Sequence, residues 1–222
     1  MAIRSSGRDY SSVSERSTED GNSITLDEMF LQLAQEASIE ASDIKVIVVG
    51  LGPGSFTGLR IGLSSARGLA LGIGSELRGV SSLLGQAWEF LSGNRVVVSL
   101  SPAGRENYFA AVYSKSREEC RCLVEPGLFS QSGLLSTVDS FLSENGRVQE
   151  VLWVGDSAVC SIGDGANLSV CHSSCIGSSL IDISQINGLF EQNSSAPWEL
   201  EPHYIRAVNA RTIAERKKGV EG

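Results

Sequence analysis

The chain has 222 residues, of which 41% are hydrophobic and 20% are charged. This balance is typical of a folded globular protein and excludes a disordered one. The net charge is −8, from 26 acidic and 18 basic residues. Because a nucleic-acid surface needs clustered lysine and arginine, we do not expect this chain to hold a nucleic acid unaided.

The first 37 residues predict a polar segment and one helix. Residues 1–22 show no strand or helix period, and we expect a poorly ordered or divergent N-terminus there. Thr25-x-x-Glu28 is a capping box, and apolar residues then recur at spacings of three and four. The sequence therefore predicts a helix over about 25–37 with one apolar stripe.

Strands then alternate with helices. Residues 44–52 form a near-continuous Val/Ile run, which is typical of a strand buried on both faces. The later predicted elements are a helix over 57–73, a strand over 76–82, a helix over 83–91, a hairpin of strands 95–101 and 107–114, a helix near 130–143, a strand over 150–156 and one more helix within 179–192. This alternation indicates an α/β fold.

The cysteines and histidines favour neither a metal site nor a secreted protein. Cys171, His172 and Cys175 lie close together, but no Cys-x-x-Cys pair occurs and the chain has only two histidines. The five cysteines are odd in number, so we expect reduced thiols in a cytoplasmic protein. Arg67 at the centre of the one long apolar helix predicts that nothing spans a membrane.

A glycine-rich turn precedes the helix over 57–73. Its glycines spell G-x-G-x-x-x-G, which is neither the dinucleotide-binding fingerprint nor a P-loop, since the phosphate-binding lysine is absent. Free backbone N–H groups at a helix start still attract anions. The candidate residues for a weak anion site or a nucleotide-proximal loop are Gly52, Gly54, Ser55, Thr57, Gly58 and Arg60. The alternative is a purely structural turn.

The helix after this turn carries small residues at regular spacing. Gly58, Gly62 and Ala66 recur every four residues, as do Gly68 and Gly72. Because each mid-helix glycine costs about 1 kcal/mol relative to alanine, the run requires a compensating reason. Small residues four apart form a groove that another backbone can approach closely. Either this groove faces the protein's own sheet, or one stripe of small residues faces the sheet and another faces a second protein.

The segment "GLGPGSFTGLRIGLSSARGLALGIG", followed by "LRGVSSLLGQA", resembles the signature of the TsaB (YeaZ) family. Weaker similarities follow at Glu106, Tyr108, "VGDSA" and "EPHYIRA". The resemblance implies an actin/Hsp70/sugar-kinase fold of two lobes, each a mixed sheet with helices. We expect the first lobe over 23–100, the second over 101–206 and a polar tail over 207–222.

The resemblance also implies the function of a non-catalytic subunit in forming N6-threonylcarbamoyladenosine at position 37 of tRNAs that read ANN codons. The expected partners are a TsaD-type catalytic paralogue, a TsaE-type ATPase, tRNA only through the complex, and a possible second copy of the chain. ATP is used by the complex, and this chain is expected to hold no cofactor, metal or catalytic residue. The implied partner-interface residues are Met29, Leu33, Gly58, Gly62, Ser65, Ala66, Gly68, Leu69 and Gly72.

The chain departs from the family in two places. Family members begin with a strand carrying Asp-Thr-Ser, which residues 1–22 lack, so the first lobe is expected to lack its initial strands through loss, divergence or a mis-set gene start. The aspartate of a family Asp-Ala-Arg segment is also missing, with "SPAGRE" in its place. Both departures disfavour an ATPase or sugar kinase of the same fold. A peptidase is disfavoured because no His-Glu-x-x-His or Gly-x-Ser-x-Gly motif occurs.

Overall fold

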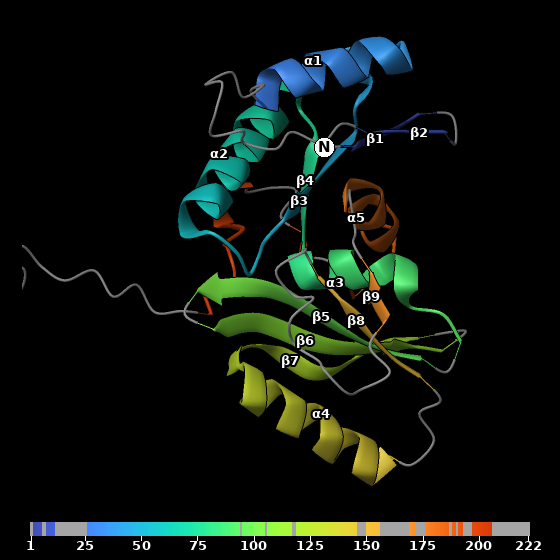
Figure 1. Cartoon of the computed structure of the whole chain (residues 1–222). Coiled ribbons are helices and arrows are strands. Elements are labelled where there is room, and N and C mark those ends of the chain that lie inside the picture. The colour runs from blue at the N-terminus through green and yellow to red at the C-terminus, as the bar shows by residue number, and fades with distance from the viewer. Residues whose placement is uncertain are drawn as a thin grey trace, which may run out of the picture.

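The computed structural model contains two mixed sheets with helices on their faces (Figure 1). This architecture confirms the predicted α/β class. The structure describes residues 2–5, 8–11, 26–93, 95–104, 106–116, 119–145, 150–155, 169–171, 176–186, 188–189, 191–192 and 197–205. The predicted tail over 207–222 lies outside these residues. Within them, no helix is both long and apolar enough to cross a membrane.

The first sheet has the strand order β10-β4-β3. Its strands are β3 (Val46–Gly50), β4 (Glu76–Val80), parallel to β3, and β10 (Glu191–Gln192), antiparallel to β4. The predicted strand at β3 is confirmed, but its full burial is wrong, since every residue of β3 is partly exposed. The physical reason is that β3 ends the described sheet and has a hydrogen-bonded neighbour strand on one side only.

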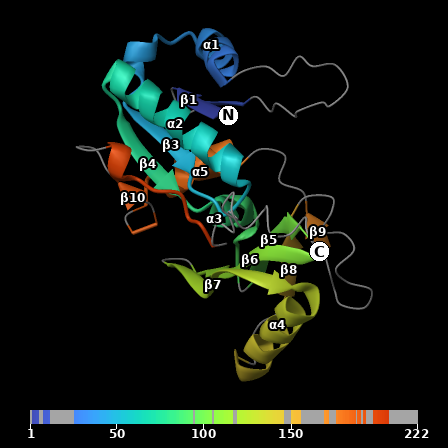
Figure 2. The same cartoon turned by 90° about the vertical axis from the view of Figure 1, so that its left-hand side faces the viewer.

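Two helices of this lobe match the predicted ones. They are α1 (Leu26–Ala37), followed by a short 3-10 turn at Ala41–Asp43, and α2 (Phe56–Ile73). Helix α2 packs on β3 and β4, and Figures 1 and 2 both show α1 near one end of α2. The stripe predicted for α1 is confirmed in its burial, because Met29, Leu33 and Ala37 face the interior.

The second sheet has the order β7-β6-β5-β8-β9. Its strands are β5 (Arg95–Gly104), β6 (Asn107–Lys115), β7 (Cys120–Ser130), β8 (Glu150–Val154) and β9 (Ser169–Cys171). The antiparallel pairing of β5 with β6 confirms the predicted hairpin, and β8 runs parallel to β5. Strand β7 is missing from the sequence-based expectation.

Helices cover both faces of the second sheet. They are α4 (Gln131–Asn145) on one face, and on the other α3 (Ser82–Ala87) with the 3-10 turn Trp88–Phe90, and α5 (Gly177–Ile183). Alternate residues of β5 point to the two faces of the sheet. Val97 joins the core under α3 and α5, whereas Val98 joins the core under α4, together with Leu134. The predicted helices over 83–91, near 130–143 and within 179–192 are confirmed, with shifted ends.

The N-terminus corrects one expectation. Residues 2–5 and 8–11 form the antiparallel hairpin of β1 (Ala2–Ser5) and β2 (Arg8–Ser11). The prediction that residues 1–22 carry no strand is therefore wrong for this part. The hairpin is a separate two-stranded sheet and does not extend the order β10-β4-β3. A Ser-Gly dipeptide between the strands is the turn signal that the sequence offers.

The predicted lobe boundary also needs correction. The boundary between residues 100 and 101 falls inside β5, which pairs entirely within the second sheet. The chain leaves the first sheet after β4 and returns to it through β10. After the 3-10 turn Pro197–Glu199, Leu200 is buried with Leu63 and Leu77 in the core of the first lobe. Residues near the C-terminal end of the described chain thus complete the first lobe.

Candidate functional site

The glycine turn between β3 and α2 is closed by internal hydrogen bonds. The backbone N–H of Gly52 donates to Ser82 Oγ at 3.1 Å, and Ser55 caps α2 by accepting from the Gly58 N–H at 3.3 Å. Gly52 has φ +101°, a conformation that glycine adopts without strain. Two amides of the candidate anion loop therefore already have protein partners.

Arg60 lies in an aromatic cluster. Its guanidinium carbon lies 3.9 Å from the centroid of the Phe56 ring, and its Nε donates to the hydroxyl of Tyr204 at 3.1 Å. The two rings are themselves 5.1 Å apart between centroids. The structure thus brings Arg60 together with Phe56 and Tyr204, two residues that sequence reasoning missed. Binding of an anion at the turn, with contacts from Gly54 and Thr57, stays a prediction.

Helix α2 has an inward and an outward side. Leu63, Ala66 and Ala70 are buried in the core of the first lobe. By contrast, a Cβ built on Gly62, Gly68 or Gly72 would meet nothing within 4 Å. These three glycines are not needed for packing α2 onto its own sheet. We call the side of α2 that carries Gly62, Gly68 and Gly72 the glycine face.

Three of the nine implied interface residues do not lie on an outward side. Leu33 is 0% exposed, Met29 4% and Ala66 7%. The reason is that the apolar stripe of an amphipathic helix faces the protein's own core. Of the others, Gly58, Gly68 and Gly72 are exposed, while Gly62, Ser65 and Leu69 are partly exposed. A partner at these six positions stays a prediction.

Sequence reasoning missed the large apolar side chains on the outer sides of the two helices. Leu31 of α1 is 65% exposed, and Ile61 and Leu71 of α2 are 56% and 60% exposed. The available signal was their position outside the buried stripe of each helix. Large apolar side chains on the exposed side of a helix are candidates for contact with another molecule.

The two helices carry opposite charges. Helix α1 contains Asp27, Glu28 and Glu36 and no basic residue. Helix α2 contains Arg60 and Arg67 and no acidic residue. A surface that binds both helices must therefore place positive charge against α1 and negative charge against α2.

The two thiols that the structure describes, Cys120 and Cys122, are poor nucleophiles. Cys120 and Cys122 form no disulfide in the described part of the chain. Partial burial raises the pKa of Cys120, and it raises the pKa of Cys122 to about 12, with Glu125 adding to the effect. Both thiols are protonated at neutral pH, and a thiol reacts as its thiolate. Among the residues that the structure describes, no three His, Cys, Asp or Glu side chains form a metal-binding group. His172 and Cys175 lie outside that part.

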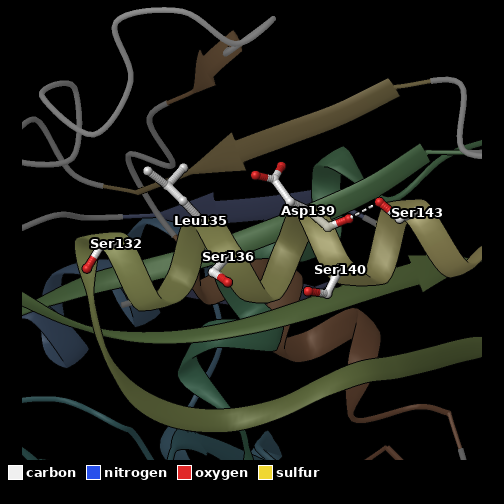
Figure 3. A pocket seen from close by; sticks show the side chains of 6 residues that line it. All are labelled: Ser132, Leu135, Ser136, Asp139, Ser140 and Ser143. Atoms are coloured by element: carbon white, nitrogen blue, oxygen red, sulfur yellow. Dashed lines mark hydrogen bonds between the residues drawn. The ribbon is translucent and has the colours of Figure 1, made fainter.

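An open hollow of about 670 Å³ lies along α4 (Figure 3). It is lined by Ser132, Leu135, Ser136, Asp139, Ser140 and Ser143. Ser143 donates to the backbone carbonyl of Asp139 at 2.8 Å, which is a local helix contact. One carboxylate among hydroxyls supplies no acid–base pair, so this hollow is not a catalytic centre of recognisable type.

Comparison with known proteins gives a consistent family. The family model of TsaD, tRNA N6-adenosine threonylcarbamoyltransferase, matches residues 16–150. The tRNA threonylcarbamoyladenosine biosynthesis protein TsaB of Escherichia coli is 42% identical over 72 residues, which are 31% of this chain and 31% of that protein. A tRNA N6-adenosine threonylcarbamoyltransferase of Jannaschia sp. is 43% identical over 63 residues, 28% of this chain and 18% of that protein.

Two solved structures of Pseudomonas aeruginosa chains share the fold over a larger part of their length. One is described as an uncharacterized protein with similarity to peptidase YeaZ, with a TM-score of 0.70, 21% identity and coverage of 92% of this chain and 93% of that one. YeaZ itself gives a TM-score of 0.63 at 20% identity, covering 91% of this chain and 92% of that one. The matches in sequence to the curated relatives, however, span only about a third of their length or less.

Proposed function

The chain belongs to the family of the TsaD model, and from this premise we propose that it is a TsaB (YeaZ)-type non-catalytic subunit that binds and activates a TsaD-type partner. The partner forms N6-threonylcarbamoyladenosine at position 37 of tRNAs that read ANN codons. The observation that carries the proposal is the glycine face, where Gly62, Gly68 and Gly72 meet no neighbouring atom of the chain. A run of mid-helix glycines is destabilising, and a closely approaching partner helix gives it a use.

A same-fold partner suits the charges of the two helices. The TsaD family model matches residues 16–150, which include both α1 and α2. In a two-fold arrangement the acidic α1 of one chain can meet the basic α2 of the other, and a same-fold partner with similarly charged helices would do the same in a pseudo-two-fold pair. A second copy of this chain meets the same requirement, so the homodimer is the competing occupant of the glycine face in the free protein.

The remaining chemistry belongs to the other subunits. The net charge of −8 disfavours direct tRNA binding by this chain, so the partner supplies the tRNA surface. A TsaE-type ATPase joins the assembled pair in the cytoplasm, and ATP is used by the complex. The sequence lacks the His-Glu-x-x-His and Gly-x-Ser-x-Gly motifs of a peptidase.

Reconstitution tests this function. The full-length chain, its TsaD-type paralogue and the TsaE-type ATPase are mixed with tRNA, ATP and threonylcarbamoyl-adenylate, and modified adenosine is measured by mass spectrometry. We expect the yield to rise at least about tenfold when the chain is added, as expected for a subunit that stabilises the active state. Modification by the chain alone, or an equal yield without it, contradicts the proposal. The control variant Ser136→Ala, on α4, should activate like the wild type.

A further inference from the structure

Exposed apolar side chains gather in one part of the molecule. Eight large hydrophobic residues are exposed in the described part of the chain. Six of them lie on α1, on α2 or in residues 197–205: Leu31, Phe56, Ile61, Leu71, Trp198 and Tyr204. Single exposed apolar residues are normal, but a gathered set marks an interaction surface. Leu128 and Ile186 lie elsewhere and serve as comparison sites.

Residues 197–205 are fastened to α2, and we call them the strap (Figure 1). Nη2 of Arg67 donates to the backbone carbonyl of Trp198 at 2.9 Å and also to that of Leu200. Further along the strap, the backbone N–H of His203 donates to the carbonyl of Leu51 at 2.8 Å. The strap backbone is thus held on the lobe, while the Trp198 side chain is 60% exposed and that of Tyr204 42%.

The strap lies beside the glycine face. Arg60 and Arg67, which contact Tyr204 and Trp198, are seven residues apart and so lie on one side of α2. Leu71 follows Arg67 by four residues, which places it one turn further along on that side. The exposed side chains of Trp198, Tyr204 and Leu71 therefore lie along the same side of α2, next to the side that carries Gly68 and Gly72.

The strap adds contact area to the footprint that the two helices offer. Helices of 18 and 12 residues are about 27 and 18 Å long, and a strip about 10 Å wide along both covers about 450 Å². A stable interface buries about 800 Å² on each partner. The strap is the adjoining surface that can supply more contact area.

We propose that the strap belongs to the partner-binding surface and that Trp198 and Tyr204 are aromatic anchors for the TsaD-type paralogue. This inference rests on the proposed function, because it names a further part of the same interface. Trp, Tyr and Arg are the residue types that dominate binding energy at interfaces. Arg60, stacked on Phe56 and bonded to Tyr204, is already ordered, so binding loses little side-chain entropy there.

The test is a titration of the full-length paralogue with the wild-type chain and with Trp198→Ala, Tyr204→Ala and the control Ile186→Ala. We expect Trp198→Ala to raise Kd at least about tenfold and Tyr204→Ala several-fold, whereas Ile186→Ala stays within about twofold. Trp198→Phe should restore most of the affinity. Unchanged affinity in both strap variants overturns the strap proposal while the proposed function stands. Absence of binding by the wild-type chain overturns both.

A second measurement needs no variant. In residue-specific oxidative labelling of the wild-type chain, Trp198 is the exposed tryptophan, since Trp88 and Trp153 are 9% and 3% exposed. Adding the paralogue should reduce labelling of Trp198 and leave that of exposed Leu128 unchanged. Equal labelling of Trp198 in the free and bound chain contradicts the proposal, whatever the folding of the variants.

Discussion

The two sheets of this chain differ in how completely they bury their own apolar surface. In the second sheet, β5 and β6 are buried on both faces, with α4 on one side and α3 and α5 on the other (Figure 2). In the first sheet, β3 is only partly buried and α2 turns three open glycines outward. The first lobe leaves apolar surface exposed, and a partner that buries this surface would gain binding free energy.

The largest effect on stability should come from a substitution in the core of the second sheet. Leu134 of α4 is 0% exposed in the core with Val98 and Leu100. Leu134→Ala should lower the free energy of unfolding by about 3 kcal/mol, because it leaves a cavity. Urea denaturation measures this loss, and partner affinity of the folded variant should not change. Leu135→Ala, next to it on the open hollow, should cost clearly less.

Next in size is a glycine that the first lobe does need. A Cβ at Gly79 of β4 would lie 2.5 Å from Cδ1 of Leu51, which is 1% exposed. Gly79→Ala should therefore cost about 1–3 kcal/mol of unfolding free energy through overpacking. A thermal midpoint equal to that of the wild type would show that this packing is looser than described.

A smaller effect is expected for Ile61→Ser on the outer side of α2. Ile61 is 56% exposed, so its loss should leave the unfolding free energy nearly unchanged. Partner affinity should fall about fivefold, which corresponds to about 1 kcal/mol. Isothermal titration with the paralogue measures it. The matched change Ile186→Ser should not alter affinity, and an equal loss in both would remove the distinction between the two surfaces.

The smallest effect has the opposite sign. A Cβ at Gly62 meets nothing within 4 Å, so Gly62→Ala should stabilise α2 by about 0.5–1 kcal/mol. The thermal midpoint should rise. A falling midpoint would mean that the glycine face is packed against the chain itself.

The alternation of strands and helices was predictable because Val-rich runs and capping signals are local. Strand β7 was not, because Pro126 and Gly127 interrupt its pattern. Proline is tolerated there because β7 is an edge strand with an irregular register against β6. The spacing of small residues did not tell which side of α2 faces outward. The structure answers this, because Ala66 is buried and Gly68 is exposed. The contact between the strap and α2 could not be predicted from the sequence, because it joins residues more than 130 positions apart.

The most direct test of the glycine face is a titration of the TsaD-type paralogue with the wild-type chain, Gly68→Ala and Gly68→Leu. The wild type and Gly68→Ala should bind with similar affinity, and Gly68→Leu should bind at least about thirtyfold more weakly while its urea midpoint is retained. That outcome would identify the outward glycines of α2 as a docking surface. Undiminished binding by Gly68→Leu, or a loss of folding that matches its loss of binding, would contradict the account.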